Sequence, residues 1–362
     1  MADPSFRNYH ITSDHAGQAI AKALRSLLRG WSWAKIKRLL HARQVQVNGN
    51  LCVDETRPLK PGDVVKVWNH PLAKPADERD VTLVYVDAHL IVVEKPAGVT
   101  TLRHKEEQKW SARRKQMQPT LDELLPRLLA KHLGWKNADI DASSLSSQHR
   151  RSSRSRGREG NPADRGRNPP KLPVVRAVHR LDRDTSGLMV FARTPQAEQG
   201  LIKLFSKHRI ERAYLAVVHG ALEEQTIDTY LVRDRGDGLR GSSPLGKAAE
   251  KAQRAITHVK PIERLDDYTL AGCRLKTGRT HQIRIHLSER GHRLCGEKTY
   301  THLQGGPPQP DTSGAPRQAL HAAVLGFVHP ATNETLRFRM PLPQDLAEWL
   351  QRLRERNQPK PS

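Results

Sequence analysis

Residues 179–187 read His-Arg-Leu-Asp-Arg-Asp-Thr-Ser-Gly, and the apolar run Leu188–Ala192 follows directly. The run has the composition of a buried strand, so the polar stretch is predicted to form a loop at the edge of that strand. Loops held by a rigid scaffold often carry catalytic groups. Asp182 has arginines at positions 180 and 183, and a neighbouring guanidinium favours the ionised form of a carboxylate. Asp182 is therefore a candidate nucleophile or base.

The composition favours a polyanionic partner. The 362 residues include 61 Lys and Arg against 38 Asp and Glu, a formal net charge of +23. Such a basic excess is typical of proteins that bind nucleic acid, and a soluble basic surface without a nucleic-acid partner is the alternative. The length allows two or three domains. No run of about 18 apolar residues indicates a membrane span, and the polar N-terminus lacks the apolar core of a signal peptide.

The three cysteines are Cys52, Cys273 and Cys295, and they lie far apart in the chain. They form neither a metal-ligand pattern nor a disulfide framework, so we expect no metal site. So few cysteines are typical of the reducing cytoplasm, where we place the protein. Cys52 and Cys273 lie in apolar, strand-like segments and are predicted to fill the core.

Residues 14–69 are predicted to form a small basic module of two helices and short strands. Asp14 is the expected N-cap of a helix over Ala16–Leu28. A second helix fits Ser32–Ala42, where apolar residues recur at helical spacing. Four basic residues lie largely away from that apolar face: Lys35, Lys37, Arg38 and Arg43.

The strands of this module are Val45–Gly49, which ends in an Asn-Gly turn, and Val64–Val67, which follows a Pro-Gly-Asp turn. The order of elements resembles the small RNA-binding domain named after ribosomal small-subunit protein S-four. The resemblance implies that the four basic residues face RNA, and the alternative is that they are only the wet face of an amphipathic helix. The Arg-Leu-Asp triplet of that family reads Ala-Ile-Ala at residues 19–21.

Composition also suggests domain boundaries. Residues 1–70 hold the module, and residues 71–81, with prolines and mixed charges, are predicted to be a linker. A large mixed domain is expected over residues 82–352, with a tail at 353–362. An Arg- and Ser-rich stretch at about 134–172 interrupts the domain. It has too few apolar residues to offset the entropy of ordering, so we predict a disordered insertion there.

Two further segments carry polar residues in suggestive positions. Residues 212–220 alternate as a strand, on which Tyr214 alone would be an ordinary core tyrosine. Residues 275–286 contain a Thr-Gly turn, after which Thr280 is expected to cap a helix. Arg284 then lies near the N-terminal end of that helix, a position that attracts anions. In isolation, Arg284 would be interpreted as a surface or ion-pair arginine.

The separate segments match one set of family motifs. Residues 179–187 fit His-Arg-Leu-Asp-x-x-Thr-Ser-Gly, residues 277–286 fit Thr-Gly-Arg-Thr-His-Gln-Ile-Arg-x-His, and the Tyr214 strand has Arg212 where the family has lysine. Together they resemble the RluA-type pseudouridine synthases, over about residues 82–350 apart from the insertions. The family's Gly-Asp-x-x-Tyr reads Gly-Glu-Lys-Thr-Tyr at 296–300, which retains the carboxylate.

The resemblance implies an α+β fold, with a mixed, mainly antiparallel sheet, flanking helices and an active site in a basic cleft. It implies that Asp182 is the catalytic carboxylate, that Arg284 pairs with it and that Tyr214 stacks on the uracil and assists removal of the carbon-5 proton. Because base chemistry needs the base out of its helix, Arg180 would fill the gap that the flipped uridine leaves. A plain phosphate contact is the alternative for Arg180.

The implied reaction is the isomerisation of uridine to pseudouridine, which requires no cofactor and no metal. The expected substrate is structured RNA, and the N-terminal module favours large-subunit ribosomal RNA over transfer RNA. A monomer is expected. The alternatives are a transfer RNA synthase of the same family, a non-catalytic RNA-binding assembly factor, and another base-acting enzyme such as a glycosylase.

Overall fold

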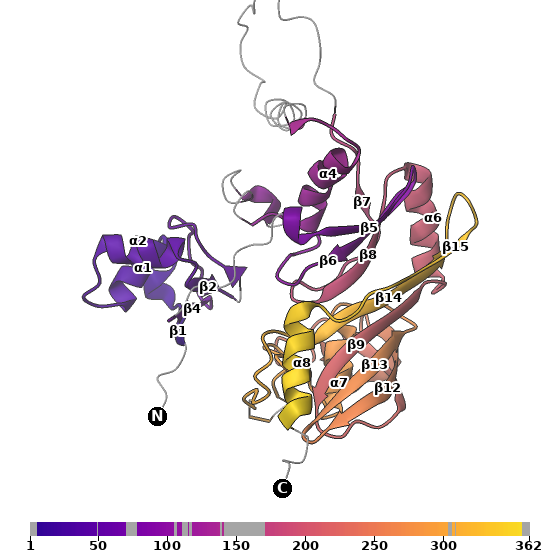
Figure 1. The fold of residues 1–362 in the computed structure, drawn as a ribbon. Helices are drawn as coiled ribbons and strands as arrows, with labels where there is room; N and C mark the ends of the chain where they lie inside the picture. Colours follow the sequence, from indigo (N-terminus) through magenta and orange to yellow (C-terminus); the bar gives the residue numbers. More distant parts are fainter. Residues whose placement is uncertain are drawn as a thin grey trace, which may run out of the picture. The chain divides into compact units, whose positions relative to one another are not determined.

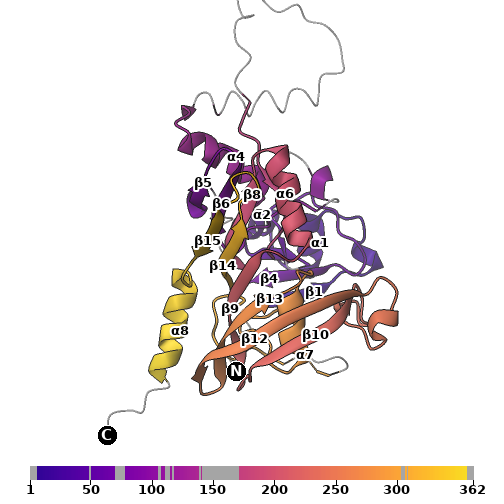
Figure 2. The same ribbon diagram turned by 90° about the vertical axis from the view of Figure 1, so that its right-hand side faces the viewer.

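The computed structural model divides into two compact units (Figures 1 and 2). The residues it describes are 6–48, 50–69, 78–104, 107–110, 115, 118–137, 140, 171–302, 306–307 and 309–356. The first unit comprises Met1–Pro75 and His104–Pro119, and the second comprises Ala76–Arg103 and Thr120–Ser362. The sequence predicts residues 104–119 to belong to the large second domain, whereas the segment clusters with the first unit. The Arg- and Ser-rich stretch predicted to be disordered lies largely outside the described residues.

The first unit packs two helices against a small antiparallel sheet with strand order β1-β4-β2-β3. Its elements are β1 (Phe6–His10), α1 (Ile20–Leu27), α2 (Trp33–His41), β2 (Val45–Val47), β3 (Asn50–Leu51) and β4 (Val64–Trp68). Both helices contribute fully buried side chains, among them Leu24 and Ile36, to one core with Val45 and Val65. The two predicted helices and the short strands after them are therefore present, but the unit begins with a strand, β1, that was not predicted.

The start of α1 differs from the prediction. Asp14 lies in a short 3-10 turn, and α1 begins only at Ile20, with Ala19 as an N-cap that makes no side-chain bond. Gly17 has a φ of +74°, a left-handed conformation that cannot continue a helix. The second helix begins as predicted, because the Ser32 side chain accepts a hydrogen bond from the backbone N–H of Lys35 at 3.2 Å.

The second unit is built on a mixed sheet of 11 strands among the described residues. The strand order is β11-β10-β12-β13-β9-β14-β8-β6-β5, with β15 paired to β14 and β7 to β8. The strands are β5 (Thr82–Val86), β6 (Leu90–Lys95), β7 (Arg176–Ala177), β8 (Ser186–Ala192), β9 (Glu211–His219), β10 (Gln225–Val232), β11 (Gly241–Ser242), β12 (Gln253–Leu265), β13 (Tyr268–Leu275), β14 (Leu320–Val328) and β15 (Thr335–Arg339). Only the β14–β8 pair is parallel, so the predicted mixed, mainly antiparallel fold is confirmed.

Helices cover both faces of this sheet. They are α4 (Leu121–His132), α6 (Pro195–Ser206), α7 (Gln282–Glu289) and α8 (Gln344–Arg356). Helices α4 and α7 pack on the face that carries Phe191, whereas α6 packs on the opposite face with Val190. Every residue of β8 is buried, which explains why its sequence is a continuous apolar run rather than an alternation. The last helix extends to Arg356, so the predicted tail at 353 begins inside a helix.

The structure also bears on the remaining compositional predictions. Cys52, Cys273 and Cys295 are buried free thiols. None of the helices in the described parts of the chain combines the length and the apolar character that a bilayer span requires.

Candidate active site

The loop that carries Asp182 joins β7 to β8, and its exit is fixed by Gly187. This glycine has a φ of +119°, and a Cβ built there would lie 2.3 Å from the carbonyl oxygen of Ala322. Gly187 and Ala322 are partners in the parallel pairing of β8 and β14. Only glycine allows the two backbones to approach so closely, so the end of the motif sets where the loop leaves the sheet.

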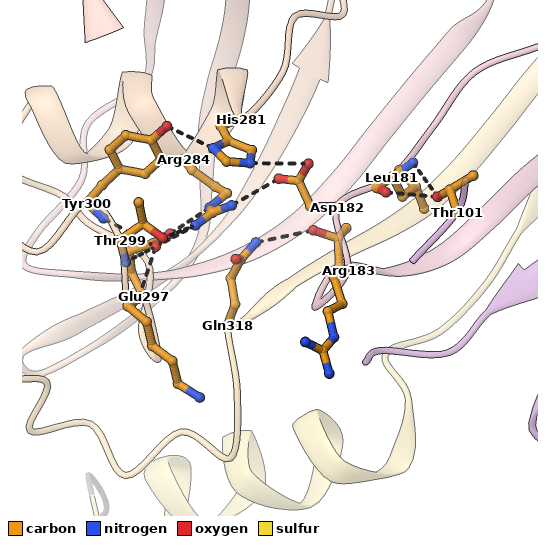
Figure 3. A network of polar contacts seen from close by, with 12 residues as sticks. Thr101, Leu181, Asp182, Arg183, His281, Arg284, Glu297, Thr299, Tyr300 and Gln318 are labelled. Atoms are coloured by element: carbon orange, nitrogen blue, oxygen red, sulfur yellow. Dashed lines mark hydrogen bonds and ion pairs between the residues drawn. The ribbon is translucent and has the colours of Figure 1, made fainter. Parts of the chain in front are cut away.

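Hydrogen bonds hold the backbone on both sides of Asp182. The fully buried Lys95 donates from Nζ to three carbonyl oxygens, one of them that of Arg183 at 3.0 Å. The Thr101 hydroxyl donates to the carbonyl of Leu181 at 2.9 Å and accepts from its N–H at 3.2 Å (Figure 3). Asp182 therefore projects from a segment whose neighbours are both anchored, as a pre-organised catalytic group requires.

The helix that carries Arg284 starts later than predicted. Thr280 was expected as its cap, but α7 begins at Gln282, and His281 is the N-cap in a left-handed conformation with a φ of 60°. The Gln282 side chain accepts hydrogen bonds from the Thr277 hydroxyl at 2.8 Å and from the N–H of Arg279 at 3.0 Å. These bonds close the turn through the glutamine, so no hydroxyl cap is needed, and the turn places His281 and Arg284 beside Asp182.

Arg284 forms a double ion pair. Its Nη1 donates to Asp182 Oδ2 at 3.2 Å, and its Nε and Nη2 donate to the two oxygens of Glu297 at 2.8 and 2.7 Å (Figure 3). Burial raises the pKa of Glu297, but its hydrogen bonds with Arg284 outweigh this and hold the pKa below its usual value. Burial likewise lowers the pKa of Arg284, and the two carboxylates raise it overall. The guanidinium and Glu297 are both charged at neutral pH.

Two residues of this network had no role in the sequence interpretation. His281 Nε2 lies 3.8 Å from Asp182 Oδ1, and His281 Nδ1 lies 2.8 Å from the Tyr300 hydroxyl (Figure 3). Burial lowers the pKa of His281, although Asp182 acts in the opposite direction, so the ring is neutral at neutral pH. Both residues belong to matched motifs, but no sequence pattern indicates that they meet at the carboxylate.

A small cavity of about 60 Å³ connects the predicted catalytic residues. Its lining includes Asp182, Tyr214, Arg180, Arg279, His281 and Arg284. The volume holds only a few water molecules. Tyr214 is 9% exposed, and burial raises the pKa of its phenol, which is therefore protonated at neutral pH. Arg180 is exposed at this site.

The predicted RNA-contact residues of the first unit do not share one environment. Lys35 and Arg38 line a cavity of about 650 Å³ with Trp31 and Trp68, and Lys35 Nζ lies 3.8 Å from the centre of the Trp31 ring. Lys37 instead forms an ion pair with Glu55 at 3.1 Å. The structure therefore does not bring Lys37 to the cavity. Arg43 follows α2 with a φ of 60° and is half-buried.

A comparison with protein families identifies the second unit. The model of the family described as RNA pseudouridylate synthase matches residues 89–289, more than half of the chain. The chain belongs to this RNA pseudouridylate synthase family. It is a pseudouridine synthase, an isomerase that acts on RNA. Within the described residues, no group of three or more His, Cys, Asp or Glu side chains could hold a metal ion.

Relatives that match this pseudouridine synthase over nearly their whole length are identical to it at about one third of positions. The "Uncharacterized RNA pseudouridine synthase YlyB" of Bacillus subtilis is 32% identical over 95% of this chain and 97% of its own length. Two proteins named "Ribosomal large subunit pseudouridine synthase D" are 32% identical (Zymomonas mobilis, 93% of this chain and 94% of its own length) and 33% identical (Xylella fastidiosa, 96% and 93%). The solved structure "Human RNA Pseudouridylate Synthase Domain Containing 4" has a TM-score of 0.52 and 21% identity over 75% of this chain and 92% of its own, which supports the fold.

Proposed function

We propose that this pseudouridine synthase isomerises specific uridines of large-subunit ribosomal RNA, with Asp182 as its catalytic carboxylate. The carrying observation is the cavity that Asp182 shares with Tyr214 and with Arg284, the ion-pair partner of the carboxylate. The choice of ribosomal RNA is supported by the names of the relatives from Zymomonas mobilis and Xylella fastidiosa, which match over nearly the whole chain. The resemblance of residues 1–70 to the S-four-type domain supports the same choice.

The reaction breaks the bond between ribose C1′ and uracil N1, turns the base and forms a bond between C1′ and C5. The proton on C5 leaves, and N1 gains one, so that substrate and product are isomers. Asp182 acts on the target nucleotide as nucleophile or as base, and either role needs its ionised form. The guanidinium of Arg284 binds one carboxylate oxygen of Asp182, which leaves the other oxygen directed toward His281.

Tyr214 provides an aromatic wall for the flipped uracil, in a position between strand core and cavity. Because its phenol is protonated at neutral pH, it removes the C5 proton only if its own proton passes to a base such as Asp182. Arg180, exposed beside the carboxylate loop, fills the gap in the RNA helix that the extruded uridine leaves.

The first unit supplies RNA affinity in this proposal. Lys35 and Arg38 contact the RNA backbone from the cavity that they line with Trp31, and Arg43 extends the basic surface beyond the helix. Lys37 was proposed for the same role, but its pairing with Glu55 reduces the charge that it offers. The working form is proposed to be a monomer.

The decisive experiment maps pseudouridine in total ribosomal and transfer RNA from a deletion strain. The strain is complemented in parallel with the wild-type gene and with Asp182→Ala. We expect specific large-subunit sites to disappear and to return only with wild type. Loss of transfer RNA sites instead would reassign the substrate. An unchanged map, or rescue of growth by Asp182→Ala, would favour the binding-factor alternative, and release of free uracil would indicate a glycosylase.

A further inference from the structure

Arg212 is a half-buried cation without an acidic partner among the described residues. Its side chain lies with its guanidinium carbon 5.6 Å from the centre of the Phe205 ring, and Phe205 stacks in turn on His179 at 4.5 Å. The Nε atom of Arg212 is buried and has no hydrogen-bond partner, and no ion pair joins Arg212 to an acid among the described residues. Burying a charge without a counter-ion is costly, so such a group indicates a missing anion.

The surroundings of Arg212 increase the positive charge. Burial lowers the pKa of Arg212, and the neighbouring Arg279 lowers it further. Burial also lowers the pKa of His208, with contributions from Arg212, Arg279 and Lys276. Arg212, Arg279 and Lys276 therefore all act on the same small region. A bound anion would offset the repulsion among these three positive charges.

The adjacent turn leaves space for this guanidinium. A Cβ built on Gly278 would lie 2.3 Å from Nη1 of Arg212. Gly278 does not have a positive φ, so the backbone conformation does not require glycine here. The missing side chain instead leaves room for the Arg212 guanidinium. The turn before α7 and the strand β9 thus form the two sides of a site in which Arg212 is held between Phe205 and Gly278.

This site lies beside the target-uridine cavity. Arg212 and Tyr214 are two positions apart on β9, so their side chains leave the same face of the strand about 7 Å apart. Arg279 lines the cavity itself. An anion bound to Arg212 would therefore lie next to a base that stacks on Tyr214. The sugar–phosphate backbone of that nucleotide would supply such an anion.

We propose that Arg212 binds one RNA phosphate that flanks the target uridine and so positions the nucleotide against Tyr214. The inference rests on the proposed role of Tyr214 and Asp182 as the uridine site. Arginine suits this task because its planar fork binds phosphate oxygens in pairs. A guanidinium already fixed against an aromatic ring loses little further conformational entropy when the phosphate arrives.

The test pairs protein variants with RNAs that carry one neutral methylphosphonate at each successive linkage around the uridine found by mapping. Affinity is measured in an Asp182→Ala background, so the result does not depend on turnover. Arg212→Met retains an apolar stem on Phe205 but removes the charge. Arg264→Ala, which removes an exposed arginine paired with Glu223, is the charge-matched control.

We expect one methylphosphonate position to weaken binding to the parent and to Arg264→Ala by about tenfold, and to leave Arg212→Met unaffected. The slope of log affinity against log salt should fall by about one contact in Arg212→Met alone. In the otherwise wild-type chain, Arg212→Met should reduce kcat/KM, with partial rescue by Arg212→Lys. Gly278→Ala, which displaces the guanidinium without backbone strain, should reproduce the loss of phosphate sensitivity, with thermal unfolding confirming that each variant folds.

The proposal is overturned if Arg212→Met and the parent respond equally to every methylphosphonate, or if the salt slope does not change. A phosphate effect that persists while Asp182→Ala retains turnover would instead overturn the catalytic assignment and leave the phosphate site standing.

Discussion

The Nη1 atom of Arg284 lies 3.2 Å from Oδ2 of Asp182, and this is the longer of the two attachments that the guanidinium makes to carboxylates. Glu297 binds it through both oxygens, at 2.8 and 2.7 Å. The Glu297 side chain is 1% exposed and that of Asp182 17%. Glu297 therefore fixes the direction of Arg284, and Asp182 is the partner that can move toward substrate.

Replacing Glu297 should damage both stability and catalysis. In Glu297→Gln the buried guanidinium loses its closest counter-charge. Breaking a buried ion pair lowers the free energy of unfolding by about 3–5 kcal/mol, and we expect a loss of that order here. We expect a lower free energy of unfolding in urea and a lower kcat, because Arg284 loses its orientation. Glu297→Asp retains the charge and is the matched variant. If the glutamine and aspartate variants were equally stable and active, the charge of Glu297 would have no part in holding Arg284.

The folded state should lose stability in mild acid because of two buried neutral histidines. Burial lowers the pKa of both His286 and His321 to about 4. An unfolded histidine titrates near 6.5, so between pH 6.5 and 4.5 the unfolded chain takes up protons that the folded rings do not bind. The free energy of unfolding must therefore fall as pH falls, by about 2 kcal/mol for each ring over that range.

Urea denaturation at pH values from 4.5 to 6.5 measures this effect. In His321→Gln, the slope of the free energy of unfolding against pH should decrease by about 1.4 kcal/mol per pH unit. The glutamine can still bond the Ser186 hydroxyl, which His321 contacts at 2.9 Å. His132→Gln is the control, since its side chain on α4 is exposed and should not alter the slope. An unchanged slope in His321→Gln would mean that His321 is not buried neutral.

Local chemistry explains which parts of the fold the sequence predicted. The apolar run of β8 and the Ser32 cap of α2 are determined by neighbouring residues, so both were predictable. The start of α1 was missed because a left-handed glycine, Gly17, overrides the capping pattern of Asp14. The start of α7 was missed because a glutamine side chain five positions after Thr277 closes the turn. Such contacts depend on conformation rather than composition.

The site shows the same division. Asp182 and Arg284 were predicted as site residues because each belongs to a long family motif, and the two side chains are in contact. The meeting of His281 with Asp182 and Tyr300 needs the folded turn and could not be inferred from spacing. The ion pair of Lys37 with Glu55 is likewise a contact between segments that only the fold brings together. It distinguishes Lys37 from the other basic residues of α2, which the sequence alone does not.

Arg180→Ala should impair the reaction most when the target uridine is paired. Filling the gap compensates for lost stacking, which costs a few kcal/mol for a paired base and least for a mismatched one. We expect the single-turnover rate on a helical substrate to fall about tenfold or more, and the rate on the same RNA with the uridine mismatched to change much less. Equal slowing on both RNAs, together with a lower salt slope, would indicate the phosphate-contact alternative instead.

The first unit should contribute affinity rather than chemistry. Deleting residues 1–70 is expected to weaken RNA binding but to leave the single-turnover rate on saturating RNA nearly unchanged. The structure sharpens this expectation to individual residues. Lys35→Ala and Arg38→Ala remove charges from the cavity of the first unit, so each should weaken binding and lower the salt slope by about one contact.

Lys37→Ala is the matched control on the same helix, because its ammonium already pairs with Glu55 at 3.1 Å and has less charge to offer to RNA. Filter binding at several salt concentrations distinguishes the three variants, and thermal unfolding checks that α2 remains folded. If Lys37→Ala weakened binding as much as Lys35→Ala, the RNA would contact the outer side of α2 rather than the cavity. If the truncated protein bound with wild-type affinity, the catalytic unit alone would account for recognition.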